Sequence, residues 1–329
     1  MTKPTALVTG ANGYTGSHLC QYLAGKGICT RGMVWAPDGQ PTFAAENLEL
    51  VDGELRDPRS LERVLEGIEV VYHIAALYRP VNVPKSMYWD VNVQGTTNLL
   101  ELAARAGVKR FVHCSTIGVH GTIDQAPADE NAALKPDDYY QYTKLKGEQK
   151  ARDLAGKLGM PTVIVRPAAI YGQGERRFLG LARLIGRRWF VMFGSGDVLY
   201  HFIHIDDLCE AFYLCARQEV AIGQTYIIAD DHAITLNQIT ATIAGALEIP
   251  PPRRNLPMWM LKAAALACEG ICWPLRVSPP IHRRRASWFA ATRSFTTAKA
   301  RRELAFDPKV RIEAGLTDMV QSYREAGWI

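Results

Sequence analysis

The sequence lacks the cysteine patterns that mark disulfide-rich or zinc-binding proteins. Its seven cysteines are odd in number, scattered and without CxxC spacing, which excludes a disulfide framework and a zinc site. They are Cys20, Cys29, Cys114, Cys209, Cys215, Cys268 and Cys272. Free cysteines used in this way are typical of a reducing compartment, so we expect a cytoplasmic protein with no metal site.

Long uninterrupted apolar runs are also absent. The chain runs from Met1 almost directly into an apolar strand, without the three regions of a secretory signal, so we expect no export. The most apolar stretch, Leu256 to Leu275, is interrupted by Pro257, Lys262 and Glu269. These residues argue against a membrane-spanning helix and leave only contact with a membrane surface open.

A strong charge of either sign is missing as well. The formal net charge is +5, and no basic stripe interleaved with aromatic residues accompanies it, so nucleic acid is not an expected partner. Hydrophobic residues make up 48% of the 329 residues, enough to bury a sizeable core. A chain of this length favours a dinucleotide-binding unit with a substrate-covering part built onto it.

Short β-branched runs alternate with helical patterns through the first half, which is typical of βαβ units and a parallel sheet. We therefore predict an α/β fold: a doubly wound parallel Rossmann sheet over residues 1–170 and a smaller C-terminal substrate-binding lobe over 171–329. The predicted strands are Ala6 to Thr9, Thr30 to Trp35, Leu48 to Asp52, Val70 to Ile74, Phe111 to Ser115 and Thr162 to Arg166. The predicted helices are Ser17 to Gly25, Ser60 to Glu66, Val91 to Ala106 and Tyr142 to Leu158. Two later strand-like pieces, Tyr200 to Ile205 and Gln224 to Ala229, leave a return of the chain to the first unit open.

A glycine-rich turn directly follows the first predicted strand. Residues Thr9 to Gly16 read TGANGYTG and lead into a helical pattern. Glycine permits a tight turn and close approach of the backbone to a pyrophosphate, and the N–H groups at a helix N-terminus attract the anion. We therefore predict a dinucleotide site here, formed by Gly10, Asn12, Gly13, Tyr14 and Gly16.

The end of the second strand bears on the choice between NAD and NADP. It lacks the acidic residue that would hold the adenosine ribose, since the sequence from Met33 to Ala36 is apolar and Asp38 comes slightly late. No lysine or arginine follows Trp35 to meet a 2′-phosphate, which favours NAD over NADP. Arg31 and Arg56 are the alternative phosphate partners.

Tyr140 and Lys144 lie four residues apart, which places them on one face of a helix. A phenol has a pKa of about 10, and a nearby ammonium lowers it, so the pair can exchange a proton with an alcohol or carbonyl oxygen. The segment Cys114 to Thr116 ends a strand at the carboxyl edge of the sheet, where doubly wound folds bind ligands. His73 and His113 are interpreted as packed strand residues.

Taken in order, these motifs resemble the extended short-chain dehydrogenase/reductases, which include NDP-sugar epimerases, 3β-hydroxysteroid dehydrogenases and dihydroflavonol reductases. The similarity runs from Ala6 to about Ala211. Its segments are TGANGYTG at Thr9, ELRDP at Glu54, VYHIAA at Val71, NVQGTTNLL at Asn92, STIGVHG at Ser115, YQYTK at Tyr140, RPAAIYG at Arg166 and HFIHIDDL at His201.

The resemblance implies roles for the candidate catalytic residues. Tyr140 corresponds to the general acid/base, and Lys144 to the residue that binds the nicotinamide ribose and lowers the pKa of the phenol. Thr116 corresponds to the hydroxyl that contacts the reacting oxygen, with Ser115 as the alternative.

The resemblance also implies a larger set of cofactor contacts. Asp57 corresponds to an adenine contact, although an aspartate before a proline is also a common helix N-cap. Asn92 is either a cofactor residue or a structural one that satisfies backbone groups. The implied residues are Leu55, Asp57, Ala75, Ala76, Asn92, Pro167 and Ile170, with Ala75 and Ala76 lining the dinucleotide and Pro167 and Ile170 bordering the nicotinamide.

Two departures from the sugar-nucleotide enzymes concern the substrate. Tyr200-His201 stand where those enzymes often carry Arg-Asp, and an asparagine common after the Arg-Pro pair is absent from Pro167 to Ile170. Because arginine forks are the usual phosphate grip, diphosphate binding looks weakened. The second half instead carries large apolar side chains, which line either a ligand site or an ordinary core. They are Trp189, Phe190, Met258, Trp259, Met260, Trp273, Trp288 and Phe289.

These features favour a dehydrogenase or ketoreductase that acts on a secondary alcohol or ketone of a fairly apolar small molecule, with NAD or NADP as cofactor. One alternative is an NDP-sugar epimerase or dehydratase that holds NAD tightly. Another is a non-catalytic dinucleotide sensor, which the intact Tyr140/Lys144 pair disfavours. The resemblance further implies a homodimer formed through the helices Val91 to Ala106 and Tyr142 to Leu158.

Overall fold

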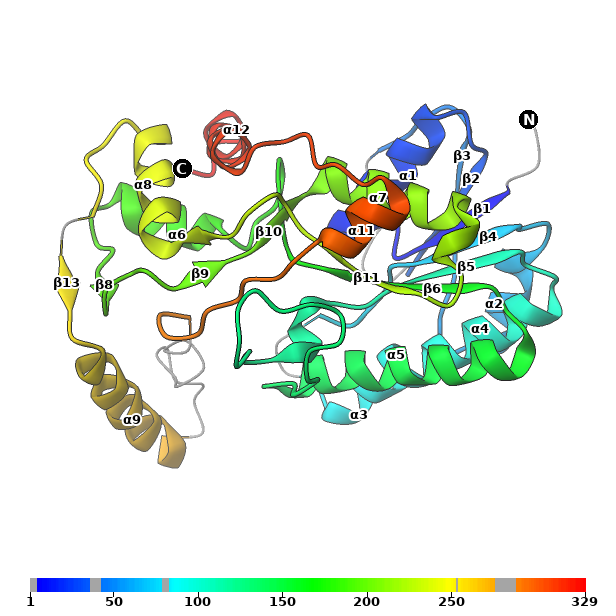
Figure 1. Ribbon diagram of the computed structural model, residues 1–329, viewed down its shortest axis with the longest axis horizontal. Helices are drawn as coiled ribbons and strands as arrows, with labels where there is room; N and C mark the ends of the chain where they lie inside the picture. The colour runs from blue at the N-terminus through cyan, green and yellow to red at the C-terminus, as the bar shows by residue number, and fades with distance from the viewer. Residues whose placement is uncertain (1–4, 36–42, 79–82, 253, 276–287) are drawn as a thin grey trace.

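The centre of the molecule is a seven-stranded, wholly parallel sheet in the order β11-β6-β5-β4-β1-β2-β3 (Figure 1). The computed structural model describes residues 5–35, 43–78, 83–252, 254–275 and 288–329, without the side chains of 269–275. The strands are β1 (Ala6–Thr9), β2 (Thr30–Val34), β3 (Leu48–Asp52), β4 (Val70–His73), β5 (Arg110–Cys114), β6 (Thr162–Pro167) and β11 (Thr225–Ile228). This arrangement confirms the predicted doubly wound α/β fold.

Helices cover both faces of the sheet, so its inner strands are buried on both sides (Figure 1). One face packs against α1 (Tyr14–Gly25), α7 (Ile205–Arg217) and α11 (Ala298–Leu304). The other packs against α2 (Pro58–Leu65), α4 (Thr96–Arg105) and α5 (Tyr139–Leu158). Between β4 and α4 lie α3 (Lys85–Trp89) and a π-helical turn, η2 (Asp90–Gly95), and η3 (Ile117–His120) follows β5.

The rest of the chain builds a second lobe with its own apolar core. Its helices are α6 (Leu179–Gly186), α8 (Leu236–Ala246), α9 (Met258–Leu275) and α12 (Ile312–Glu325). Its strand pairs are β7 (Ala169–Tyr171) with β10 (Phe202–His204), β9 (Leu199–Tyr200) with β12 (Ile234–Thr235), and β8 (Met192–Phe193) with β13 (Asn255–Leu256). Within the described ranges, none of the helices has the length and apolarity needed to span a membrane.

Several predicted bounds differ from the structure by one to three residues, and α1 begins at Tyr14 rather than Ser17. Three further differences have a clear structural basis. The helix predicted to begin at Tyr142 begins at Tyr139, because Asp138 caps it by accepting a hydrogen bond from the Gln141 N–H at 2.8 Å. The helix predicted from Val91 is divided into η2 and α4. The strand predicted from Tyr200 is divided into β9 and β10, because the two halves pair with different strands.

Candidate functional site

The glycine-rich turn between β1 and α1 is packed so closely that a side chain would not fit at Gly10 or Gly16. A Cβ atom on Gly16 would lie 2.0 Å from the Gly10 carbonyl oxygen, and one on Gly10 would lie 2.9 Å from Ala75 Cα. Gly10 also has a positive φ of 73°, which favours glycine. Helix α1 begins after Gly13 without a side-chain cap, so its first N–H groups face outward from the turn. The turn therefore fits the pyrophosphate of a dinucleotide.

The other predicted residues of the turn have structural contacts. Asn12 Nδ2 donates to the Trp35 carbonyl at 3.2 Å, which ties the turn to the end of β2. The Tyr14 hydroxyl is buried and points toward Gly172, where an added Cβ would lie 2.9 Å from it. These contacts hold the turn against both β2 and the second lobe.

A directional chain of hydrogen bonds links this turn to η2. Thr9 Oγ1 accepts from the Ala75 N–H at 3.1 Å, so its own proton is available to His73 Nδ1 at 3.0 Å. Thr96 Oγ1 donates to the Asn92 carbonyl at 2.9 Å and therefore accepts from His73 Nε2–H, also at 2.9 Å. His73 is thus a neutral imidazole with both ring nitrogens bonded, as expected for a packed strand residue.

The buried, neutral state of His73 predicts that the stability of the protein depends on pH. Burial, together with repulsion from Lys144, lowers the pKa of His73 to about 3. Because the unfolded state binds a proton near pH 6.5 and the folded state does not, the contribution of His73 to stability is complete above that pH and falls as the pH drops toward 3. Between pH 7 and pH 5, we expect the free energy of unfolding of the wild type to fall by about 2 kcal/mol more than that of His73→Gln. Urea unfolding of both proteins at each pH measures this difference.

The matched control is His232→Gln, because the His232 side chain is 61% exposed. This variant should show the wild-type dependence on pH. If the free energy of unfolding of His73→Gln depended on pH as that of the wild type does, His73 would not be a neutral, buried imidazole in the folded protein.

The candidate acid–base pair lies where α5 crosses the carboxyl end of β5. Lys144 is buried, and its Nζ donates to the Cys114 carbonyl at 2.7 Å. Burial lowers the pKa of Lys144, while the Glu148 carboxylate opposes that shift. Tyr140 is half-buried one turn earlier, and its ring meets the Tyr78 ring edge-on at 5.0 Å. The structure therefore brings Tyr140, Lys144 and the end of β5 together.

The two candidate hydroxyls after β5 are in different environments. Thr116 is half-buried and begins η3, where its Oγ1 accepts from the Gly118 N–H at 3.1 Å. Ser115 is buried and donates to Glu148 Oε2 at 2.7 Å. Because the Ser115 proton is committed to this carboxylate, Thr116 is the better placed of the two to contact a substrate oxygen.

The remaining predicted cofactor residues divide between the sheet edge and internal packing. Asp57 caps α2 by accepting from the Arg59 N–H at 3.1 Å, which is the alternative role given above. Asn92 is buried and binds both the Leu77 backbone and Thr143 Oγ1, so its contacts are structural. Leu55 is buried against Gly95.

Four others lie in or near strands. Ala75 and Ala76 follow β4 after Ile74, Pro167 is the last residue of β6, and Ile170 lies in β7 with its carbonyl bound to Arg177 at 2.7 Å. Since β1, β4 and β6 are parallel, Ala75, Ala76 and Pro167 share the carboxyl edge with the glycine turn, while Ile170 belongs to the separate β7–β10 pair.

The residues that bear on NADP binding are already paired. Arg31 contacts Glu49 at 3.0 Å and two backbone carbonyls, and Arg56 contacts Glu54 at 2.7 Å. Asp38 lies outside the described residues.

The Tyr200-His201 pair offers no cation to a diphosphate. The Tyr200 hydroxyl donates to the Trp288 carbonyl. His201 Nδ1 accepts from the Phe295 N–H at 3.2 Å, and Nε2 donates to the Asp230 carbonyl at 2.9 Å. Burial lowers the pKa of His201, which matches this neutral form.

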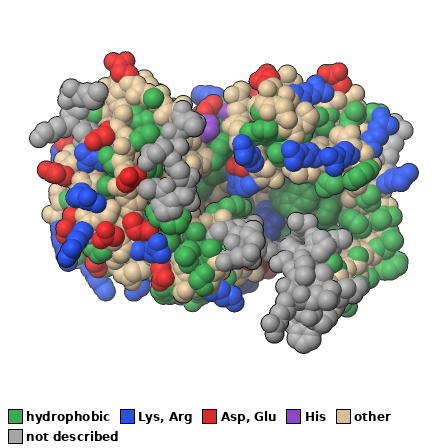
Figure 2. Space-filling view, turned by 180° about the vertical axis from the view of Figure 1, so that it is seen from behind, with side chains coloured by type: hydrophobic (Ala, Val, Ile, Leu, Met, Phe, Trp, Pro, Cys, Tyr) green, Lys and Arg blue, Asp and Glu red, His purple; other side chains and the backbone are tan. Residues whose placement is uncertain are grey.

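The surface is hollowed between the two lobes, with hydrophobic side chains on its walls (Figure 2). Several of the large apolar residues nevertheless belong to the core of the second lobe. Trp288 packs on Tyr200 at 5.6 Å and on Phe289 at 5.3 Å, and Phe190 is buried. Trp189 and Trp259 are instead 69% and 67% exposed. The Trp273 side chain lies outside the described residues.

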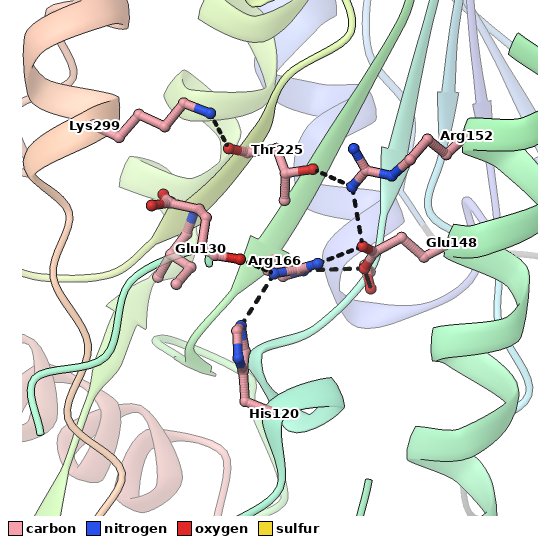
Figure 3. A network of polar contacts seen from close by, with 9 residues as sticks. His120, Glu130, Glu148, Arg152, Arg166, Thr225 and Lys299 are labelled. Atoms are coloured by element: carbon pink, nitrogen blue, oxygen red, sulfur yellow. Dashed lines mark hydrogen bonds and ion pairs between the residues drawn. The ribbon is translucent and has the colours of Figure 1, made fainter. Parts of the chain in front are cut away.

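Sequence reasoning missed a buried network around Glu148 and Arg166 (Figure 3). Two signals were present. Glu148 follows Lys144 by four residues on the same helix, and Arg166 is a charged residue within an otherwise apolar strand.

Comparison with known proteins gave consistent matches. A model of the NAD dependent epimerase/dehydratase family matches residues 6–229. Sterol demethylase protein B of Methylococcus capsulatus is 29% identical, covering 99% of this chain and 100% of its own. 3Beta-hydroxysteroid-dehydrogenase/decarboxylase isoform 2 of Arabidopsis thaliana is 26% identical over 98% of this chain, which spans only 62% of that relative's length. The crystal structure of a dTDP-glucose 4,6-dehydratase from Streptomyces venezuelae with NAD bound superposes with a TM-score of 0.78, at 26% identity and 98% coverage of each chain.

Proposed function

This chain belongs to the NAD-dependent epimerase/dehydratase family, and from that premise we propose that it is an NAD(P)-dependent oxidoreductase. Its proposed reaction interconverts a secondary alcohol and a ketone on a fairly apolar small molecule. The observation that carries the proposal is the position of Lys144, whose Nζ is fixed on the Cys114 carbonyl at 2.7 Å, one helical turn from Tyr140.

Each residue at this edge of the sheet has a chemical role in the proposed reaction. The Tyr140 phenol gives a proton to the ketone oxygen or takes one from the alcohol, and Thr116 Oγ1 hydrogen-bonds the same oxygen. The Lys144 ammonium favours the phenolate and binds the nicotinamide ribose. Gly10, Gly13 and Gly16 would let the backbone approach the pyrophosphate, and free N–H groups of the turn would bind it, while the Gly13 N–H itself donates to the Gly10 carbonyl at 2.9 Å. When bound, the dinucleotide accepts or supplies the hydride.

The proposal of an apolar substrate is supported by the Tyr200-His201 pair. Its polar atoms are engaged within the protein, so this pair does not supply the arginine fork that usually grips phosphates. Two relatives carry sterol chemistry in their names, which agrees with an apolar substrate. Arg293 supports the alternative of a sugar-nucleotide enzyme. Its guanidinium lies over the Tyr200 ring at 5.9 Å and 3.9 Å from the Asp137 carboxylate, and it could approach a phosphate.

The test is a comparison of net redox turnover with two substrate sets. We expect purified protein to reduce added NAD in proportion to oxidation of a sterol-like or flavonoid-like secondary alcohol, followed by absorbance of the reduced nicotinamide. Conversion of a UDP- or dTDP-sugar without accumulation of reduced nicotinamide would contradict the proposal and favour an epimerase or dehydratase.

The preference for NAD over NADP has its own test. A fluorescence titration should show tighter binding of NADH than of NADPH, and the reverse order would contradict the preference for NAD.

Two expectations stay predictions. The family resemblance implies a homodimer formed through the helices around Val91 to Ala106 and Tyr142 to Leu158, and the use of cysteine favours a cytoplasmic location.

A further inference from the structure

Glu148 and Arg166 form an ion pair deep in the protein, between α5 and β6 (Figure 3). Arg166 donates twice, to Glu148 Oε1 at 2.5 Å and to Glu148 Oε2 at 3.1 Å. Their side chains are only 3% and 2% exposed. A two-pronged contact of this kind fixes orientation as well as distance.

The Glu148 carboxylate also contacts the end of β5. Ser115 Oγ donates to Glu148 Oε2 at 2.7 Å. Ser115 lies between Cys114, whose carbonyl holds Lys144, and Thr116. One carboxylate therefore connects α5, β6 and the three-residue segment that carries the contacts of the candidate site.

The remaining donors of Arg166 hold neighbouring segments. Arg166 donates to the Glu130 carbonyl at 3.0 Å and to His120 Nε2 at 3.1 Å. Since a guanidinium only donates, His120 Nε2 accepts and the ring is neutral. Burial, together with the positive charge of Arg166, lowers the pKa of His120 to about 4.

We propose that Glu148, oriented by Arg166, is a positioning residue that holds the segment Cys114 to Thr116 and the Lys144 ammonium in place beside Tyr140. This inference rests on the proposed function, because it takes Lys144 and Tyr140 as the acid–base pair. It adds a role for residues that contact neither substrate nor cofactor in the proposal above.

Stability alone is a weak reason for this ion pair. Removing two charges from water is costly, and apolar residues of similar volume can replace buried ion pairs with little loss of stability or even a gain. A role in placing neighbouring groups explains the pair better, since its carboxylate also binds Ser115.

The electrostatic surroundings of Lys144 agree with this role. The groups that act on its charge come from three elements: Cys114 and His113 on β5, His73 on β4, and Glu148 on α5. Burial keeps both histidines neutral by lowering their pKa. Burial likewise keeps the thiol protonated, because it raises the pKa of Cys114 to about 11. Glu148 therefore supplies the negative charge that opposes the lowering of the pKa of Lys144 by burial.

The decisive variant replaces both charges by apolar groups, E148L/R166L, so that no unpaired charge is buried. We expect the protein to stay folded with a lower urea unfolding midpoint, because Ser115, His120 and the Glu130 carbonyl lose their hydrogen-bond partners. We expect the acid dissociation constant of Lys144 to rise about tenfold or more, a fall in pKa of about one unit. We also expect kcat to fall about tenfold, and the high-pH limb of the plot of kcat against pH to move to lower pH. The KM for NADH should stay within about twofold of the wild-type value.

The pKa of Lys144 is measured by NMR on protein labelled at lysine side-chain carbons, with Lys144→Arg used to assign the signal. This measurement requires neither turnover nor a bound dinucleotide. Glu148→Gln gives a second test. It keeps one oxygen acceptor for Ser115, removes the charge, and replaces the second acceptor of Arg166 by an amide donor.

The matched control is R110L/E219L. This pair, 2.6 Å apart, joins the opposite end of the same strand β5 to the η4 turn (Glu219–Ala221), away from the candidate site. Its removal should leave the Lys144 pKa, kcat and the pH profile at wild-type values.

A wild-type Lys144 pKa in folded E148L/R166L would overturn the positioning role, whatever the turnover. If Glu148→Gln fails to fold, the double variant decides the question. If wild-type protein turns over none of the proposed substrates while the Lys144 pKa responds as expected, the proposed function fails and the electrostatic coupling stands.

Discussion

Replacing Tyr140 by phenylalanine is expected to lower kcat by about 10²- to 10⁴-fold and to leave NADH affinity nearly unchanged. The substitution removes only the phenol oxygen. The edge-on contact of the ring with Tyr78, at 5.0 Å, is made by the ring itself and remains available. Steady-state kinetics with the identified substrate and a fluorescence titration with NADH measure the two quantities separately.

The matched control for this prediction is Tyr142→Phe on the same helix. Tyr142 is 39% exposed and stacks on Tyr139 at 6.0 Å, so its hydroxyl lies outside the candidate site. We expect its kcat within about twofold of the wild-type value. Full activity in Tyr140→Phe would contradict the acid/base assignment. A loss of NADH binding would instead indicate damage to the cofactor site.

The parallel sheet could be predicted from the sequence because its strands are buried on both faces. Such strands are short, apolar and β-branched, and the predicted range of β1, in which every residue is buried, agrees with the structure. The start of α5 was placed three residues late, although Asp138 followed by Gln141 already carried a capping signal. Recognising that cap would have placed Tyr140 in the first turn of the helix.

The buried polar networks could not be predicted from spacing along the chain. The contact of Thr9 with His73 depends on the register of β1 against β4, which places these two residues side by side. The contact of Arg166 with Glu148 depends in the same way on how α5 packs over β6. A buried polar side chain shows in the sequence that a partner is needed, and only the three-dimensional arrangement shows which partner it is.

The apolar residues of the second half illustrate the same limit. Their abundance favoured an apolar substrate, but Trp288 and Phe289 pack mainly against the core of the second lobe. That core is assembled from segments far apart in the chain, including α6, α8 and α12. Composition therefore supports an apolar substrate less directly than the internal bonding of Tyr200 and His201 does.

Replacing Gly16 by alanine is expected to weaken NADH binding by at least about tenfold and to lower the free energy of unfolding by about 1–3 kcal/mol. The added Cβ would lie 2.0 Å from the carbonyl oxygen of Gly10 and 3.1 Å from Ala11 Cα. Both contacts are with backbone atoms, so no side chain can rotate away to make room. The turn itself has to move, and with it the N–H groups that are proposed to bind the pyrophosphate.

Gly25→Ala is the matched control, because Gly25 ends the same helix and a Cβ there would meet nothing within 4 Å. We expect unchanged NADH affinity and a gain of up to about 1 kcal/mol in the free energy of unfolding. Fluorescence titration and urea unfolding of both variants separate the two roles of Gly16. If Gly16→Ala lost stability but bound NADH as tightly as the wild type, the glycine would be required for packing α1 on β1. The dinucleotide would then have to bind elsewhere than on this turn.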